Sequence, residues 1–170
     1  GVVFFLFLYN KLVFRKNKHL LKTIGSYIKT LKPKKTLEKS DVKILFIDDE
    51  HTNFRMVSIL KTNGWRNTES MTDITDLDDY NIKEANIIFV DINGVGKTLF
   101  KDEGLGLASA LKKRYSGKVI VIYSAETKGD RFHKALREVD ACLAKNADPY
   151  EFINLIETLW NQNKHNYQTT

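Results

Sequence analysis

The chain has 170 residues, 42% of them hydrophobic and only two of them proline, which suits one globular domain with an extension of some tens of residues. This length leaves little room for a second full domain. The single cysteine, Cys142, excludes an internal disulfide framework, and no Cys or His pairs stand at zinc spacing.

The formal net charge of +6 is divided unevenly along the chain. Residues 1–40 hold ten basic residues against one acidic residue, Glu38, and so carry +9, which leaves −3 on residues 41–170. The excess of basic residues lies within residues 1–40, so residues 41–170 lack the positive charge that is typical of a DNA-binding surface. We expect no nucleic-acid partner.

Residues 2–9 form an apolar run that is interrupted at 10–11 and resumes at 12–14. This run is shorter than the roughly 20 apolar residues of a spanning helix. Because the sequence begins with Gly1 rather than Met and basic residues follow the run, we interpret residues 1–14 as the end of a transmembrane helix. The rest of the chain would then lie at the cytoplasmic face of the cell membrane. The alternatives are a helix packed on the domain, or a signal-peptide core, which normally has its charges before the apolar run.

Residues 15–40 are rich in lysine and contain apolar residues at near-helical spacing, from Leu20 to Leu31, which predicts a basic amphipathic helix. Pro33 interrupts this pattern. We assign residues 15–40 to a juxtamembrane linker, residues 41–165 to the folded domain and residues 166–170 to a tail.

Beyond residue 41, continuous apolar runs alternate with segments of helical period, the pattern of a parallel sheet covered by helices on both faces. Strands are predicted at residues 42–47, 87–91, 119–123 and 141–144, with another at 67–71. Helices are predicted around residues 56–60, 72–84, 107–111, 132–139 and 149–160, the last capped by Asp148. We therefore predict an α/β fold with a doubly wound, five-stranded parallel sheet.

Acidic residues follow two of the predicted strands. Asp48 and Asp49 come after the first strand, and Asp91 ends the strand at 87–91. Ligands bind beyond the carboxyl ends of strands in such sheets, so the three carboxylates should converge there. Such a cluster is costly without a cation, and its hard oxygen ligands favour Mg²⁺.

A hydroxyl and an ammonium group complete the same edge. Ser124 follows the strand at 119–123, and Lys145 follows the strand at 141–144. These are the donors that a phosphoryl group on a carboxylate needs. Singly, Asp48 and Asp49 could be a helix cap and a solvated acid, and Lys145 a surface charge. Jointly, those readings become improbable.

With these residues, the sequence over 42–163 resembles the receiver domain of response regulators in two-component signalling. The resemblance implies a flavodoxin-like sheet in the order 2-1-3-4-5. It also implies roles for the site residues: Asp91 as phosphoacceptor, Ser124 as the switch hydroxyl that closes on the phosphoryl group, and Lys145 as the lysine that pairs with the phosphoryl group. The implied metal ligands are Asp48, through water, and Asp49, Asp91 and the carbonyl of Asn93.

The resemblance further implies a partner and a mode of action. A histidine kinase or a phosphotransfer protein would supply the phosphoryl group from phosphohistidine, with Mg²⁺ as the cofactor. A downstream protein would read the state at the face of the fourth helix, fifth strand and last helix. Such a domain is a signalling module rather than an enzyme, apart from its own phosphoryl transfer and autodephosphorylation.

The sequence departs from the receiver pattern at three places. The loop 92–103 is longer than usual, and we expect it to be mobile with a solvated Lys97. The alternative is that the loop caps the site and that Lys97 reaches the phosphoryl group. Asn146 replaces the proline that usually follows the lysine. Cys142 stands where a switch aromatic is usual, and we expect it to be a small core residue.

These departures motivate an alternative function, a phosphorylation-independent receiver that acts as a protein-binding module. A third function, a Mg²⁺-dependent phosphatase, is disfavoured because such enzymes resemble a pattern with a second Asp where Asn93 stands. A nucleotide-binding P-loop around Gly96 is disfavoured because that pattern needs a glycine at the position of Asp91.

Overall fold

The computed structural model describes residues 13–15, 17–26, 37–50, 54–125 and 134–167. The chain divides into two compact units, residues 1–35 and residues 36–170. In the first unit, residues 13–15 and 17–26 are helical. No helix within the described ranges is long and apolar enough to cross a membrane. Most of the predicted transmembrane end, residues 1–12, lies outside those ranges.

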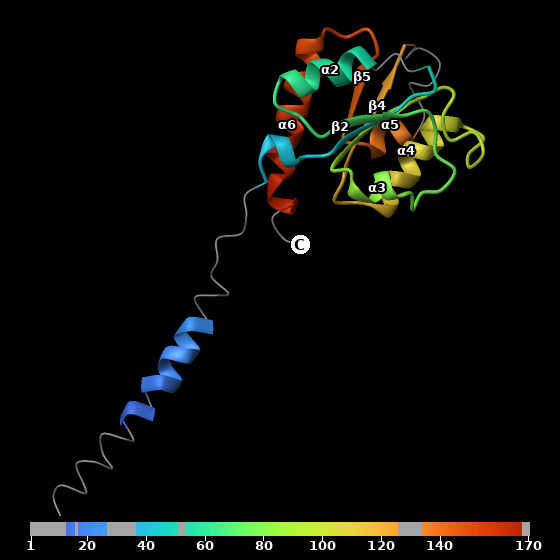
Figure 1. The fold of residues 1–170 in the computed structure, drawn as a ribbon. Coiled ribbons are helices and arrows are strands. Elements are labelled where there is room, and N and C mark those ends of the chain that lie inside the picture. The colour runs from blue at the N-terminus through green and yellow to red at the C-terminus, as the bar shows by residue number, and fades with distance from the viewer. Residues whose placement is uncertain (1–12, 16, 27–36, 51–53, 126–133, 168–170) are drawn as a thin grey trace, which may run out of the picture. The chain divides into compact units, whose positions relative to one another are not determined.

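The second unit is built on a five-stranded parallel sheet in the order β2-β1-β3-β4-β5 (Figure 1). Its strands are β1 (Ile44–Ile47), β2 (Thr68–Met71), β3 (Ile87–Asp91), β4 (Val119–Ser124) and β5 (Ala141–Ala144). Every residue of β1, β3 and β4 is buried, because these central strands are covered on both faces. The predicted fold class and strand order are confirmed.

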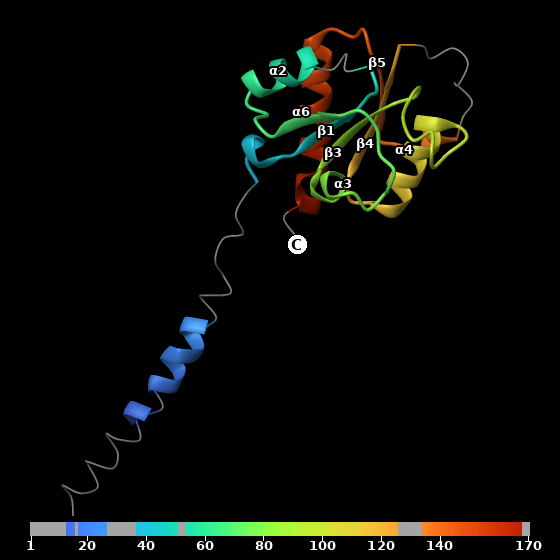
Figure 2. The same cartoon turned by 45° about the vertical axis from the view of Figure 1, so that its right-hand side comes forward.

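Helices cover both faces of the sheet. They are the short 3-10 helix η1 (Lys39–Asp41), α2 (Phe54–Thr62), α3 (Tyr80–Glu84), α4 (Glu103–Arg114), α5 (Ala135–Glu138) and α6 (Pro149–Tyr167). Helices α2 and α6 lie on one face, and α3, α4 and α5 lie on the other (Figures 1 and 2). Asp148 caps α6 as predicted, since its Oδ1 accepts a hydrogen bond of 2.8 Å from the amide of Tyr150.

Two hydrophobic cores separate the sheet from its helices. Under α2 and α6 the core is aromatic: Phe46 stacks on Phe89 with ring centroids 4.5 Å apart, and Tyr123 meets both rings edge-on. Under α3, α4 and α5 the core is aliphatic, with Ile88 and Leu107 among its buried members. The two cores fix the strands from both sides and so fix the positions of the strand ends.

Two predicted helices differ from those in the structure. Of residues 72–84, only Tyr80–Glu84 form a helix, because aspartate side chains bind the backbone ahead of it. Asp73 accepts from the amide of Ile74 and Asp76 from the amide of Asp78, which favours turns over helix. The helix predicted at 132–139 is observed as Ala135–Glu138, and residues 126–133 lie outside the described ranges.

The prediction that Cys142 is a small core residue is wrong, because its side chain is exposed. It lies on β5, an edge strand in which half-buried and exposed residues alternate. Ala141 and Leu143 pack against the aromatic core, and the alternation directs Cys142 to the opposite face. On that face the described part of α5 is a single helical turn.

Candidate functional site

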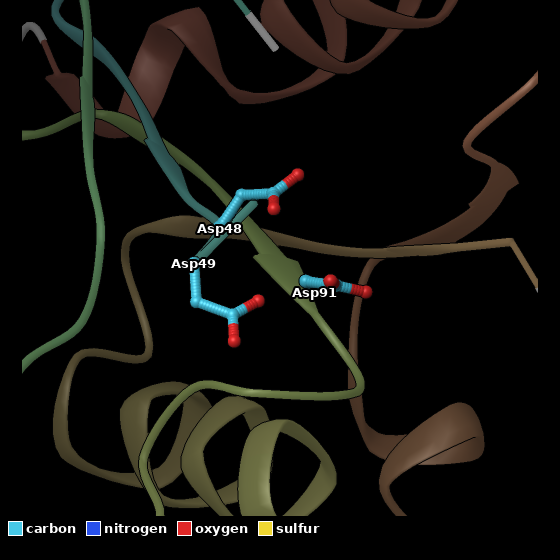
Figure 3. Close-up of side chains that lie close together, drawn as sticks. All are labelled: Asp48, Asp49 and Asp91. Carbon is cyan, nitrogen blue, oxygen red and sulfur yellow. The ribbon is translucent and has the colours of Figure 1, made fainter. Parts of the chain in front are cut away.

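Three carboxylates gather at the carboxyl ends of β1 and β3. Ile47 pairs with Val90 in the sheet, so Asp48 and Asp91, the next residues, lie at the same edge. One carboxylate oxygen from each of Asp48, Asp49 and Asp91 lies within 4.8 Å of the other two (Figure 3). Asp48 and Asp91 are buried, whereas Asp49 is exposed. The cluster is therefore anchored in the core and open on one side.

Lys145 joins two of these carboxylates. Its Nζ lies 2.8 Å from Oδ2 of Asp91 and 3.0 Å from Oδ2 of Asp48. The amide of Lys145 donates a hydrogen bond of 2.9 Å to the carbonyl oxygen of Ser124, which ties the residue after β5 to the end of β4. The side chain of Lys145 is only 12% exposed. Its ammonium group is thus held in a fixed position beside Asp91.

Burial and neighbouring charges shift the pKa values of this pair. Burial raises the pKa of Asp91, and the carboxylate of Asp48 adds to the effect, while the hydrogen bond from Lys145 opposes it. For Lys145, burial disfavours the ammonium form, but hydrogen bonds to Asp91 and Asp48 outweigh burial and raise its pKa. Lys145 therefore stays protonated at neutral pH.

Each buried carboxylate has a second source of support. Oδ2 of Asp48 accepts a hydrogen bond of 2.7 Å from the hydroxyl of Tyr123, and its Oδ1 accepts one of 2.9 Å from the amide of Glu50. Oδ1 of Asp91 accepts a hydrogen bond of 2.7 Å from the amide of Ile92. These contacts orient both side chains toward the cluster.

The donor set suits a hard divalent cation. Lys145 lies beside Asp48, Asp91 and, at 3.8 Å, Glu50, while the exposed Lys97 lies 3.9 Å from Asp49. Four carboxylates therefore face two ammonium groups, so negative charge is in excess at this site. Carboxylate oxygens that converge on an open space are the ligands that Mg²⁺ prefers. Asp49, which faces solvent, would leave the cation accessible to a phosphate group.

The loop from residue 92 to 103 packs tightly against the site. Val95 is fully buried in the aliphatic core, and the amide of Gly94 donates a hydrogen bond of 2.7 Å to Oε2 of Glu103. Nζ of Lys97 lies 3.9 Å from Oδ2 of Asp49, and its side chain is 57% exposed. Side-chain burial and hydrogen bonds therefore pack the loop against the site, and the exposure of Lys97 agrees with the expected solvated side chain. The mobility of the loop stays a prediction.

Two glycines allow the chain to pass close to the Asp49 carboxylate and to the backbone of Asp91. Gly94 has φ +83°, and a Cβ atom there would lie 2.0 Å from Oδ2 of Asp49. A Cβ atom on Gly104 would lie 1.7 Å from the carbonyl oxygen of Asp91. Both approaches leave no room for a side chain.

The other two predicted site residues lie at the same edge of the sheet. Ser124 is the last residue of β4 and is buried, one residue beyond Tyr123, which pairs with Asp91. Asn93 is an exposed residue of the loop, next to Gly94. An open pocket of about 420 Å³ adjoins the site and is lined by Lys145, Tyr123 and Arg55 among others.

Sequence reasoning missed two residues that shape the site. Tyr123 is not among the predicted site residues, but its hydroxyl binds Asp48 and its ring is buried. Glu103 is not among them either, but it anchors the loop through Gly94. The signal for Tyr123 was available: a tyrosine at the end of a buried strand needs a partner for its hydroxyl.

Comparisons with solved structures place this fold among response-regulator receiver domains. A receiver domain protein (CheY-like) from Methanospirillum hungatei JF-1 is 18% identical with a TM-score of 0.57, over 73% of this chain and 97% of that one. The receiver domain of NtrX from Brucella abortus is 24% identical with a TM-score of 0.55, over 68% of this chain and 96% of that one. This chain matches only 29% of a longer NtrX structure.

An orphan response regulator of H. pylori is 16% identical with a TM-score of 0.53, over 70% of this chain and 96% of that one. No protein-family model and no curated protein matches the sequence. At these identities the comparisons show the fold, and the function has to be argued from the site.

Proposed function

We propose that this protein is a phosphoacceptor receiver of a two-component or phosphorelay system. Asp91 takes a phosphoryl group from a phosphohistidine on a histidine kinase or a phosphotransfer protein. The observation that carries the proposal is the position of Asp91, buried at the end of β3 with its Oδ2 2.8 Å from Lys145. The receiver fold supports it.

In the proposed transfer, a carboxylate oxygen of Asp91 forms a bond to phosphorus while the phosphorus–nitrogen bond of the donor breaks. The electron pair of that bond leaves with the imidazole. Lys145 stays protonated and provides a positive charge next to the new acyl phosphate. Hydrolysis by water would later restore Asp91, so the domain turns over only its own phosphoryl group.

Asp48, Asp49, Asp91 and the carbonyl group of Asn93 would hold Mg²⁺. When bound, the cation would neutralise the carboxylate cluster and stabilise charge on the phosphoryl oxygens. The carboxylates supply the oxygen ligands, and the tight packing of Gly94 against Asp49 keeps that side chain at the site.

Phosphorylation would add about −1.5 to −2 charges and three acceptor oxygens at Asp91. Ser124 ends β4 and Lys145 follows the adjacent strand β5, so their attraction to the phosphoryl group would shift both strand ends. The surface of α5, β5 and α6 would change with them. We propose that a downstream protein reads the state on this surface.

Intact-mass spectrometry after incubation with phosphoramidate tests the function directly, since this reagent contains the phosphorus–nitrogen bond of the natural donor. We expect one phosphoryl adduct that depends on Mg²⁺ and is absent from Asp91→Asn. Asp148→Asn is the matched control, because asparagine caps a helix as well as aspartate does. A folded protein that gains no adduct would instead indicate a phosphorylation-independent binding module.

A further inference from the structure

The helical residues 13–15 and 17–26, here together called the N-terminal helix, expose large apolar side chains. Val13, Phe14, Leu20, Leu21 and Ile24 have exposed fractions from 39% for Val13 to 75% for Phe14. Within residues 17–26, at 3.6 residues per turn, Leu20, Leu21 and Ile24 fall within an arc of about 100° on one side of the helix. These three side chains therefore form one apolar face.

Basic residues lie opposite the apolar arc and on its flank. At 100° per residue, Lys22 lies about 150° from the centre of the arc and Lys18 about 110° from it. Residues 13–26 contain four basic residues and no acidic ones. Two polar side chains bind the backbone of their own helix: Thr23 donates to the carbonyl of His19 at 3.0 Å, and Ser26 to that of Thr23 at 2.8 Å.

A second copy of this helix is a poor match for the apolar face. Pairing two copies would bring equal positive charges together, with no acidic residue to form a salt bridge between them. The fourteen residues of 13–26 span two heptads, fewer than the three or four that identify a coiled coil. Asn17 at the centre of the apolar arc weakens the face for either occupant.

An anionic lipid surface matches both sides of the helix. A bilayer interface takes up apolar side chains to a depth of about 5–10 Å, and long basic side chains extend from it to acidic headgroups. We propose that the N-terminal helix binds along its length to the surface of an anionic lipid bilayer. This proposal does not depend on phosphorylation of Asp91.

Vesicle cosedimentation of the full chain tests this proposal, with phosphatidylcholine vesicles compared with vesicles that also contain phosphatidylglycerol. We expect much stronger binding to the anionic vesicles, and weaker binding at high salt. Lys18→Gln with Lys22→Gln should lower the affinity about fivefold for each lysine. Leu20→Gln with Leu21→Gln should lower it by about tenfold or more.

Glutamine keeps the helix propensity of both lysine and leucine, so these variants change the surface of the helix and leave its stability nearly unchanged. Lys61→Gln with Lys101→Gln is the matched control, because it removes the same charge from exposed positions of the second unit and should bind as the wild type does. Asn17→Leu should bind more tightly, since it completes the apolar arc.

Two results would overturn the proposal. Equal binding to neutral and anionic vesicles that survives both double substitutions would assign the interaction to the apolar run 2–9. Absence of binding together with a dimer in sedimentation equilibrium would make a second copy the occupant.

Discussion

The hydroxyl of Tyr123 donates a hydrogen bond of 2.7 Å to Oδ2 of Asp48, the same oxygen that lies 3.0 Å from Nζ of Lys145. The ring of Tyr123 packs edge-on against Phe46 and Phe89, so the hydrogen bond connects the aromatic core to the acidic cluster. The side chain of Asp48 is thus held both by the hydroxyl of Tyr123, whose ring lies in the aromatic core, and by the ammonium group of Lys145.

Replacing Tyr123 with phenylalanine should destabilise the protein by about 1.5–3 kcal/mol, the usual range for a hydrogen bond to a charged group. The ring packing is retained, so the loss reports on the hydroxyl alone. Urea unfolding monitored by circular dichroism measures it. Tyr115→Phe is the matched control, because its hydroxyl also donates to a carboxylate, Asp78, at 2.8 Å but near the surface. Equal losses in the two variants would show that burial of Asp48 adds nothing.

Replacing Gly94 with alanine should weaken Mg²⁺ binding while leaving the fold intact. The added Cβ would lie 2.0 Å from Oδ2 of Asp49 and would push this carboxylate away from Asp48 and Asp91. The positive φ adds backbone strain of about 1–2 kcal/mol. Calorimetric titration with Mg²⁺ measures the affinity. Gly117→Ala is the control, since nothing lies within 4 Å of a Cβ atom there; unchanged affinity in Gly94→Ala would contradict the assignment of Asp49 as a ligand.

Replacing Lys145 with glutamine should make stability depend strongly on Mg²⁺. Without the ammonium group, Asp48 and Asp91 lose their shared cation, at a cost on the order of 3 kcal/mol. Bound Mg²⁺ should restore much of this loss. Lys112→Gln breaks a half-buried pair with Asp140 at 2.8 Å, away from the acidic cluster. Calorimetry with and without Mg²⁺ measures the melting temperatures of both variants. The melting temperature of Lys112→Gln should drop and should not rise again in Mg²⁺. A similar rise in Mg²⁺ for both variants would argue against a cation at the site.

The sequence was sufficient for the sheet because β1, β3 and β4 are buried on both faces and therefore appear as continuous apolar runs. The acidic cluster was predictable for a related reason. In a parallel sheet all strands end at one edge, so residues far apart in sequence meet there. Asp48, Asp91 and Lys145 needed only the strand assignments.

The loop was not predictable, because its structure depends on contacts between distant residues. Gly94 and Gly96 suggested mobility, whereas Val95 between them is buried in the same aliphatic core as Leu107 of α4. Nothing local in the sequence distinguishes a valine that is exposed on a loop from one that fills the core. The short helix α3 was overestimated for the opposite reason, since the aspartates before it bind their own backbone locally.

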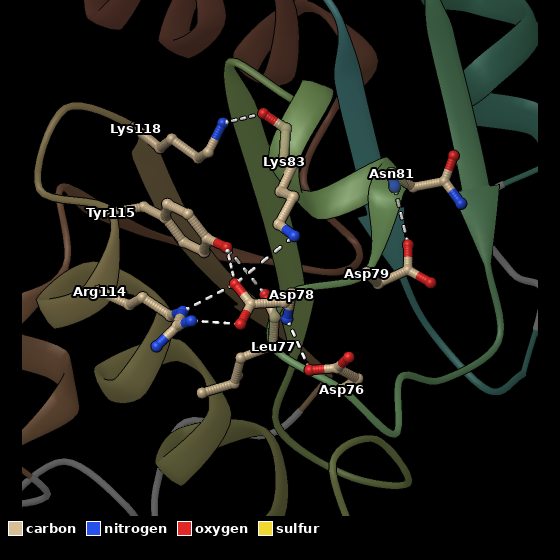
Figure 4. Close-up of polar contacts among 9 residues, drawn as sticks. All are labelled: Asp76, Leu77, Asp78, Asp79, Asn81, Lys83, Arg114, Tyr115 and Lys118. Atoms are coloured by element: carbon tan, nitrogen blue, oxygen red, sulfur yellow. Dashed lines mark hydrogen bonds and ion pairs between the residues drawn. The ribbon is translucent and has the colours of Figure 1, made fainter.

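Asp78 forms the centre of a surface network in which pH dependence can be predicted (Figure 4). Its Oδ1 accepts hydrogen bonds from the hydroxyl of Tyr115 at 2.8 Å and from Nε of Arg114 at 3.0 Å, and Nη2 of Arg114 binds its Oδ2. The hydrogen bond from Tyr115, followed by that from Arg114, lowers the pKa of Asp78 below its ordinary value of 3.8. The folded protein therefore binds a proton at this carboxyl less readily than the unfolded chain does.

A lowered pKa in the folded state stabilises the protein above pH 3.8, and this contribution disappears as the pH falls through the folded-state pKa. Asp78→Asn should therefore have a lower melting temperature than the wild type at neutral pH, and the difference should vanish in strong acid. High salt should reduce the difference, since the network is exposed. Arg114→Gln and the double variant complete a cycle that isolates the coupling. A melting-temperature difference that stays constant from neutral to acid pH would mean that the effect comes from the amide and not from the charge of Asp78.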